Sequence, residues 1–576
     1  MKRYVLFIIL FIWSALCFAG DKEIINAMQT EIQRAMSNLR IEKMETPYFI
    51  SLRFRENNYV IFYYNFGSFI EKIENKNRVV QALVRVNKPE MDNSNYAEKF
   101  GENSWNIVES SLPLEDDVLA LRQIFWKAID DAYKSSLQVF SDKKAYLQQH
   151  PQEDYPIDFL PIEEKIELIL QPEAITDNDF IQSYIKDLSS FLRDYSFLTE
   201  GLVYGGVNNV VQYYIDSEGN RHKRPDSYIY VNVKLSAYTE DWYNIKRSIN
   251  WAGRSIENLP KVYEAKENIK LILNDMQLIL DQKPLEEYNG PVVFVGEASA
   301  KFFFDLLGKG ISEVREPLGI EKSLFRFFSR DKGFLSKKIN QRILPSSFNV
   351  WDKPNLKEID NKLLIGYMPV DDEGIKSKEI QIVKEGKIIA FPMRRTAMKK
   401  YAEANGHARS SYFSIPDSYI TNLIIEDVNG LSEEEFLKKI NEIAVQEGLE
   451  EILMITKLKS DEDAPEDMLE MFGSGAEGNY LSMPQVMYIY NIKTNEKKPV
   501  WGLKFSKVNE GSLKNIVGSL KLPTLFQYYP SSTMGPVPIS IYCPSGIIIE
   551  ELNLVKTKKQ MTMSFPLPMP ELKKVK

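Results

Sequence analysis

Three residues in the second half of the chain could do chemistry by their type and setting. Glu297 precedes an expected helix and could act as a general base, but a catalytic carboxylate needs a positioned water and a metal or acid partner. His407 lies in a Gly-flanked turn beside Arg409, where it could bind a peptide carboxylate or a carbonyl. The alternative for His407 is a local hydrogen bond that only supports the fold.

Three adjacent acids at residues 371–373 could hold a hard cation, because such ions prefer several oxygen ligands. No spaced set of further ligands accompanies these acids, and Gly374 follows them directly. Acidic residues before a glycine are typical of a turn. We therefore expect a turn at these residues and no metal.

The chain has few nitrogen or sulfur ligands. Its histidines are His150, His222 and His407, and its cysteines are Cys17 and Cys543. A peptidase zinc needs about three protein ligands and an open position for water. Three histidines and two cysteines are few ligands for an ordinary zinc site. We expect His222, which is surrounded by basic residues, to be an exposed loop residue.

A strand, a turn and a helix between residues 288 and 310 must position Glu297. The sequence Asn-Gly-Pro at 289–291 predicts a turn, Val-Val-Phe-Val at 292–295 predicts a strand, and Gly296 leads into a helix. On that helix Asp305 and Lys309 are four residues apart, on a different face from the apolar side chains. These residues alone predict a core helix with an ion pair on its solvent side.

The same stretch, YNGPVVFVGEASAKFFFDLLGKG, resembles the TldD/PmbA family, whose complexes act as metallopeptidases. In the catalytic type of subunit, such a strand leads to a helix with the motif His-Glu-x-x-x-His, and a glycine precedes the second histidine. Aligning Gly308 with that glycine places Phe304 and Lys309 at the histidine positions and Asp305 at the glutamate position. The sequence PVVFVGEASAKFF is more similar to the non-catalytic type of subunit, which keeps the fold and lacks the metal ligands.

Further landmarks extend the resemblance over nearly all of the chain after residue 19. They include the opening PYFIS, the turn DDEG, two strands at 378–383 and 387–392 joined across Glu385-Gly386, the turn NGHARS and a Thr-Asn strand. Within these landmarks, Arg409 and Asn422 are the candidates for binding a peptide substrate.

The resemblance implies a third zinc ligand, a cysteine shortly before a Val-Pro strand near the C-terminus. Val-Pro is present at 537–538, but the upstream position falls near Tyr529 and Pro530, and Cys543 lies beyond the Val-Pro pair. Phenylalanine and lysine donate no lone pair to a metal at neutral pH. By this alignment all three ligands are missing, and we expect no cofactor.

One alternative is an active metallopeptidase with a non-standard zinc site, formed by Glu297, Asp305 and His407. Another is a peptide-binding module that is not an enzyme. The main expectation is a ligand-free subunit that pairs with a homologous TldD-like subunit, or with itself, to enclose a chamber where peptide is cut. In that role the chain would shape the chamber or hold the substrate.

The N-terminus predicts export. Residues 1–19 contain Lys2 and Arg3, an apolar run and Ala19 as the last residue before the expected cleavage, which is typical of a secretory signal peptide. An uncleaved anchor and a lipoprotein signal on Cys17 are the alternatives. No other run approaches transmembrane length, so we expect a periplasmic or extracellular protein without a further membrane segment. After cleavage only Cys543 would remain, which excludes an internal disulfide.

Composition places the chain among ordinary folded proteins. The net charge of -8 and the pI near 5.5 provide no global basic field, so nucleic acid is not an expected partner. We expect an α+β fold with N-terminal helices on antiparallel sheet over 20–287 and a mixed or barrel-like β domain over 288–557. A long helix is expected from about 112 to 149, a linker near 148–161 and a flexible tail over 558–576.

Overall fold

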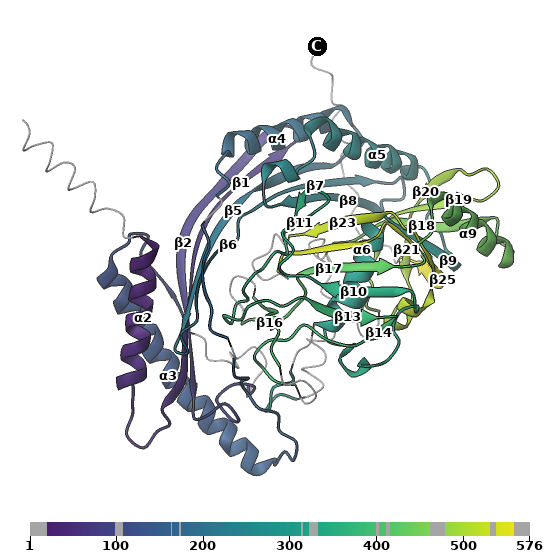
Figure 1. The fold of residues 1–576 in the computed structure, drawn as a ribbon. Helices are drawn as coiled ribbons and strands as arrows, with labels where there is room; N and C mark the ends of the chain where they lie inside the picture. The colour runs from purple at the N-terminus through teal and green to yellow at the C-terminus, as the bar shows by residue number, and fades with distance from the viewer. Residues whose placement is uncertain are drawn as a thin grey trace, which may run out of the picture.

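The computed structural model describes residues 20–97, 108–162, 164–171, 174–312, 315–321, 332–398, 403–410, 415–460, 479–529 and 537–557. The signal peptide expected at 1–19 and the tail expected at 558–576 lie outside these ranges. Within them the fold is α+β, as predicted (Figure 1). No helix in the described ranges is both long and apolar enough to cross a membrane.

An eight-stranded sheet forms the N-terminal half and curves around the C-terminal half (Figure 1). Its centre is the long antiparallel pair β1 and β2, followed along the sheet by β5 and its partners. The strands are β1 (Pro47–Asn65), β2 (Ser68–Val86), β3 (Val108–Ser111), β4 (Glu167–Ile169), β5 (Glu200–Asp216), β6 (Arg221–Pro225), β7 (Tyr228–Tyr238) and β8 (Asn244–Gly253).

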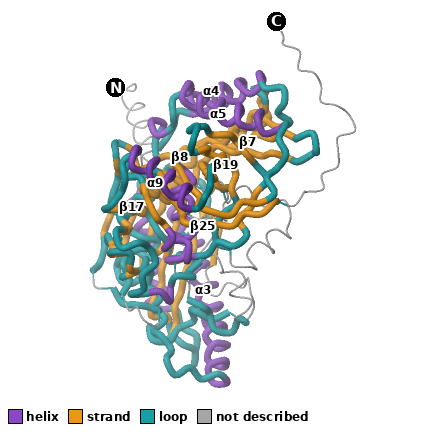
Figure 2. Tube along the Cα trace, turned by 90° about the vertical axis from the view of Figure 1, so that its right-hand side faces the viewer, coloured by secondary structure: helices purple, strands orange, loops and turns teal. Residues whose placement is uncertain are grey.

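Four helices cover the convex face of this sheet. They are α2 (Asp21–Asn38), α3 (Val118–Gln149), α4 (Asn178–Phe191) and α5 (Val262–Leu280). Alternate residues of β1 point toward these helices: Ile50, Leu52 and Phe54 pack with α2 and α3, whereas Val60 and Phe62 pack with α4 and α5. Figure 2 shows α4 and α5 together at one end of the molecule. Because side chains alternate along a strand, the other residues of β1 face the C-terminal half.

The C-terminal half is built mainly from two open sheets with a buried helix between them. It also has two short pairs, β11 (Glu358–Ile359) with β12 (Lys362–Leu363) and β15 (Ala408–Arg409) with β16 (Asp417–Ser418). One sheet has the order β20-β19-β18-β9-β25-β21, with β22 beside β25, and the other has the order β14-β13-β10-β17-β24-β23. The expected mixed sheet is confirmed, because β17 pairs with β24 and β18 pairs with β9 in parallel while the other pairs are antiparallel. No closed barrel is present among the described strands, and the buried helix packs between the two sheets.

The strands of the first sheet are β9 (Glu287–Val295), β18 (Glu451–Leu458), β19 (Pro484–Asn491), β20 (Lys497–Val500), β21 (Leu503–Phe505), β22 (Ile516–Ser519) and β25 (Gly546–Lys556). Those of the second are β10 (Phe348–Asp352), β13 (Ile380–Lys384), β14 (Lys387–Ile388), β17 (Asn422–Asp427), β23 (Pro523–Tyr528) and β24 (Ile539–Pro544). The buried helix comprises α6 (Glu297–Phe303), a π-helical turn (Phe304–Gly308) and α7 (Lys309–Ile311). On its outer face, the first sheet is covered by α9 (Glu433–Gln446).

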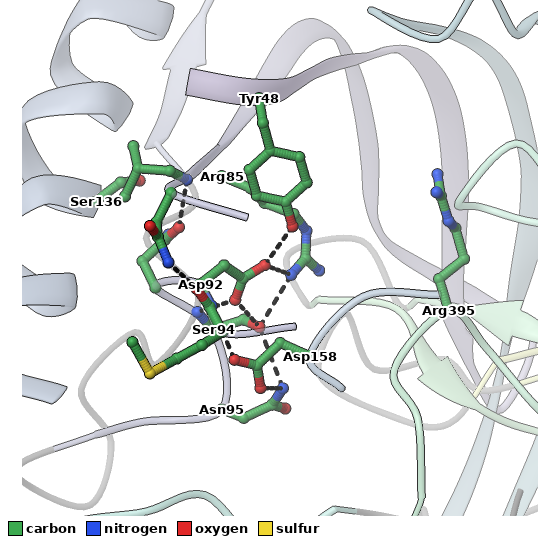
Figure 3. Close-up of polar contacts among 12 residues, drawn as sticks. Tyr48, Arg85, Asp92, Ser94, Asn95, Ser136, Asp158 and Arg395 are labelled. Atoms are coloured by element: carbon green, nitrogen blue, oxygen red, sulfur yellow. Dashed lines mark hydrogen bonds and ion pairs between the residues drawn. The ribbon is translucent and has the colours of Figure 1, made fainter. Parts of the chain in front are cut away.

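A buried ionic network joins α3 to the segment that follows it. Lys143 is fully buried, and its Nζ lies 2.5 Å from the Asp158 carboxylate. Asp158 also accepts from Tyr155 and Asn95, and Arg315 of the C-terminal half lies 3.0 Å away. Figure 3 shows Asp158 beside Asn95 at the lower end of this network. The second half of the expected linker is therefore fixed inside the protein and connects both halves of the chain.

Replacing Asp158 tests this network. Asp158→Ala would leave the Lys143 ammonium buried without its carboxylate, and we expect a loss of about 3–5 kcal/mol in the free energy of unfolding. Urea unfolding followed by circular dichroism measures the loss. Asp154→Ala, at an exposed position of the same segment, is the matched control and should leave the midpoint unchanged. Equal midpoints for the two variants would contradict the proposed role of the network.

Candidate functional site

The predicted strand and helix around Glu297 are present, but the turn predicted at 289–291 is wrong, because these residues belong to β9 and pair with β25. β9 ends at Val295, and Gly296 adopts a left-handed φ of 61° that turns the chain into α6. A glycine suits this position because a side chain would be strained there. The Gly296 N–H donates to Ser545 O, which joins the turn to the start of β25. The helix is therefore held between β9 and β25 at its first residue.

The expected motif positions lie on the buried helix, Phe304 and Asp305 on its π-helical turn and Lys309 at the start of α7. The Asp305 carboxylate is fully buried, and Oδ1 lies 2.7 Å from Lys301 Nζ and 3.1 Å from Lys309 Nζ. Oδ2 accepts a hydrogen bond of 3.0 Å from Ser482 N. The predicted pair of Asp305 and Lys309 is present, but its solvent-side placement is wrong. Both sheets pack against this helix, so Asp305 has no face open to water.

Phe304 occupies the first histidine position and contributes a ring with no metal donor. Lys301 Nζ and Lys309 Nζ lie 4.9 and 5.1 Å from its centroid, and the Tyr528 ring packs 5.6 Å away. Tyr528 ends β23, next to the position expected for the cysteine ligand. The two expected histidine positions thus lie together beside the end of β23, and aromatic rings and ammonium groups occupy this place.

Cys543 lies elsewhere on the same helix–sheet interface. It pairs with Thr524 across β23 and β24, and its thiol interacts with Ser299 of α6. Ser299 precedes Phe304 by five residues, which is about 7.5 Å along a helix. Burial raises the pKa of the Cys543 thiol well above its ordinary value, so the group stays protonated and is a poor metal ligand. The residues present therefore do not fit a zinc ion of the expected type.

The alternative metal ligands are held apart by partners of their own. Glu297 binds Lys457 Nζ through both carboxylate oxygens, at 2.7 and 2.8 Å. His407 is fully buried; its Nδ1 lies 2.8 Å from Asn405 Oδ1, and its Nε2 lies 3.6 Å from Asp352 Oδ2. The described ranges contain no group of three or more His, Cys, Asp or Glu side chains that could hold a metal.

The two candidates for substrate binding are engaged inside the protein. Arg409 is buried, and its Nη1 donates to Ile420 O at 2.7 Å. Asn422 is fully buried, and its amide donates to the carbonyls of Lys353 and Leu356 at 3.0 Å. Arg409 therefore joins a short strand to the segment before β17, and Asn422 joins β17 to the loop after β10.

Comparisons with known proteins agree with this geometry. Residues 288–460 match the family model described as PmbA/TldA metallopeptidase C-terminal domain. A protein of Archaeoglobus fulgidus named metalloprotease is 30% identical over 105 residues, which span 18% of this chain and 23% of that protein. The crystal structure of TldE from Thermococcus kodakarensis superposes with a TM-score of 0.61 at 12% identity and covers 92% of this chain and 100% of its own. Residues 288–460 of this chain are thus a domain of the TldD/PmbA family.

Two further solved structures share the fold of this TldD/PmbA-family protein. Both are described as modulators of DNA gyrase, one from Thermotoga maritima and one from Bacteroides thetaiotaomicron. The first has a TM-score of 0.57 at 14% identity, covering 88% of this chain and 96% of its own. The second has a TM-score of 0.56 at 11% identity, covering 94% and 100%. The family is one associated with metallopeptidases.

The acidic turn of this family member is the centre of a buried arginine cluster. Asp372 Oδ1 accepts from Arg224 Nη2 at 2.9 Å, and Oδ2 lies 3.7 Å from Arg53 Nη1 and 3.6 Å from Arg55 Nη2. Burial alone would raise the pKa of Asp372, but Arg224, Arg55 and Arg53 together lower it well below its ordinary value. Asp372 therefore connects the C-terminal half to the N-terminal sheet.

The sequence carried a weak signal for this cluster. Ser51, Arg53 and Arg55 alternate with the apolar residues of β1, which indicates a second, polar face of that strand.

The expectation for His222 is wrong, because His222 lies on β6, is buried, and stacks on Tyr214 at 5.3 Å between centroids. Burial, and then Arg224, lowers its pKa to about 3, so His222 is neutral.

The Asp372 cluster predicts a pH dependence of stability. A carboxylate whose pKa is lowered by folding stabilises the protein above its unfolded pKa of about 3.9, and this contribution is lost as the pH falls through the folded value. We expect Asp372→Asn to lower the melting temperature at pH 7 and the difference from wild type to shrink as the pH falls below about 4. Differential scanning calorimetry at pH 7 and pH 3 measures both. Asp241→Asn, at an exposed position, should match wild type throughout, and a difference between Asp372→Asn and wild type that stays constant with pH would contradict the assignment.

Proposed function

We propose that this chain is a ligand-free TldD/PmbA-family subunit that pairs with a catalytic metallopeptidase subunit and shapes or lines the chamber where peptide is cut. The observation that carries the proposal is the Asp305 carboxylate held by Lys301 and Lys309 at the motif position. An ammonium group presents protons and cannot donate a lone pair to a metal. In this proposal Lys301 and Lys309 supply the positive charge that a metal would supply in a catalytic subunit.

The fold of the neighbours also supports a subunit role. A TldE structure covers 92% of this chain, so almost all of the scaffold is kept although the ligand set is missing. We propose a homologous TldD-like chain as the partner, or a second copy of this chain, and unfolded peptide as the substrate of the complex. We also propose export to the periplasm or the cell exterior, on the basis of residues 1–19, with Lys2, Arg3 and Ala19 as the features of the signal.

Co-purification tests the pairing. The full-length chain carrying a C-terminal affinity tag is purified from its native cells under mild conditions, and its companions are identified by mass spectrometry. We expect a companion with a His-Glu-x-x-x-His motif, and peptide cleavage by the complex that is lost on zinc chelation. The chain freed of that companion should not cleave peptide.

Two results would contradict the proposal. One is a purified chain that cleaves peptide by itself and loses that activity on chelation. The other is a chain that purifies without a companion and without self-association at the concentration found in the cell. A variant of the companion whose motif glutamate is changed to Gln is the control, because it should keep the complex and lose the cleavage.

A further inference from the structure

The first half of β2 forms an open edge of the N-terminal sheet. β1 and β2 run side by side along the curved sheet (Figure 1), and β3 lies beside β2 only from Val79 to Ala82. No strand in the described part of the chain pairs with that side of β2 from Phe69 to Lys76. A sheet edge of this kind presents backbone N–H and C=O groups that can bind a further strand.

The backbone groups of Lys72, Glu74 and Lys76 point out of this edge. The Arg78 carbonyl accepts a hydrogen bond of 2.9 Å from Leu112 N, so the backbone groups of Arg78 face the side of β3. This orientation alternates along a strand, and β2 keeps an unbroken register with β1 from Arg78 to beyond Lys72. The N–H and C=O groups of all three residues therefore face the same side as those of Arg78.

The side chains along this edge are open to solvent. Phe69 is 54% exposed, which is unusual for a large apolar residue on a strand. Lys72 and Glu74 form an exposed ion pair of 2.5 Å with each other. The Lys72 ammonium lies 5.9 Å from the centroid of Phe62, so this ion pair is on the convex face of the sheet.

A twofold register centred on Ile73 brings opposite charges together at this edge. In an antiparallel pair, residues whose backbone groups face the edge must lie opposite each other. Centring the pair on Ile73 places Lys72 opposite Glu74 of the partner subunit, and the symmetry repeats this contact. Ile73 then meets its own copy on the concave face, where Ile61 lies beside it. The centre also lies midway along the open part of the edge, so β3 of each copy stays outside the paired segment.

The other twofold registers are unfavourable. Registers centred on Glu71, Lys72 or Glu74 place each of these residues opposite its own copy, and like charges directly opposite each other are destabilising. The register centred on Asn75 places Lys72 opposite Arg78, which is again a pair of like charges. The charges along the edge thus select one register.

We propose that two copies of this chain pair antiparallel through the β2 edge, about a twofold axis at Ile73, and form one continuous sheet across the dimer. An isologous contact of this kind closes on itself, so association ends at the dimer. The proposal deepens the pairing with a second copy stated above and rests on that part of the proposed function. A chain that stays monomeric would leave pairing with a catalytic companion intact, because co-purification tests that pairing separately.

Sedimentation velocity of the purified full-length chain tests the dimer. The runs span about 1 to 100 µM, because a small interface gives weak association that depends on concentration. We expect the sedimentation coefficient to rise from the value of a monomer to that of a dimer over this range. A chain that remains monomeric throughout, or that forms species larger than a dimer, would overturn the proposal.

Charge variants test the register. Lys72→Glu brings carboxylates opposite each other across the dimer and should raise its Kd at least about tenfold. Lys72→Glu/Glu74→Lys exchanges the two charges, restores the opposite pairs and should return the Kd to within about threefold of wild type. Lys498→Glu, at an exposed position on the edge strand β20 of another sheet, is the matched control and should dimerise as wild type does. An unchanged Kd for Lys72→Glu, or a double variant as weak as the single one, would overturn the proposal.

Discussion

A helix that is packed on all sides has to neutralise every charge that it carries. Burying an ionised carboxylate without a partner is costly, and such groups are paired or bind a metal. Asp305 meets this requirement with two lysines and one backbone N–H. The protein itself therefore neutralises the buried charge of Asp305 at the motif position. The surrounding sheets pack on the apolar residues of the helix.

The N-terminal sheet also has to pair the charges that it buries, here over one whole face of the sheet. Its convex face is apolar and covered by helices, whereas its concave face is polar and buried against the C-terminal half. Arginines on that face need carboxylates, and Asp372 of the C-terminal half supplies one to Arg53 and Arg224. A pair of the opposite sense joins Glu218, in the turn after β5, to Arg395 of the C-terminal half. These charge pairs couple the two halves.

Local elements could be predicted from the sequence because they depend on neighbouring residues. The turn at Glu385-Gly386 has φ values of 48° and 76°, and it joins β13 to β14 as the hairpin pattern indicated. The long helix begins at Val118, not at 112, because Asp117 accepts from Ala120 N and caps it there. The strand before Gly296 was also predicted, but β9 begins at Glu287 and includes the residues expected to form a turn.

Long-range contacts could not be predicted in the same way. Nothing near Asp372 in the sequence indicates Arg53, more than three hundred residues away, and the burial of His222 depends on the C-terminal half that covers β6. The solvent-side placement of the Asp305 pair failed for the same reason, since the second sheet that covers this helix is formed by distant strands. The absence of histidines from the two motif positions, in contrast, was readable directly from the residue types.

Zinc binding by the purified chain tests the central claim most directly. The full-length wild-type protein and the variant Phe304→His/Asp305→Glu/Lys309→His are each incubated with equimolar zinc, desalted and assayed by inductively coupled plasma mass spectrometry. The account predicts little retained zinc for wild type and a clear gain for the variant, which restores two histidine ligands at one place. Stoichiometric zinc in the wild-type chain, with peptide cleavage that chelation abolishes, would contradict it.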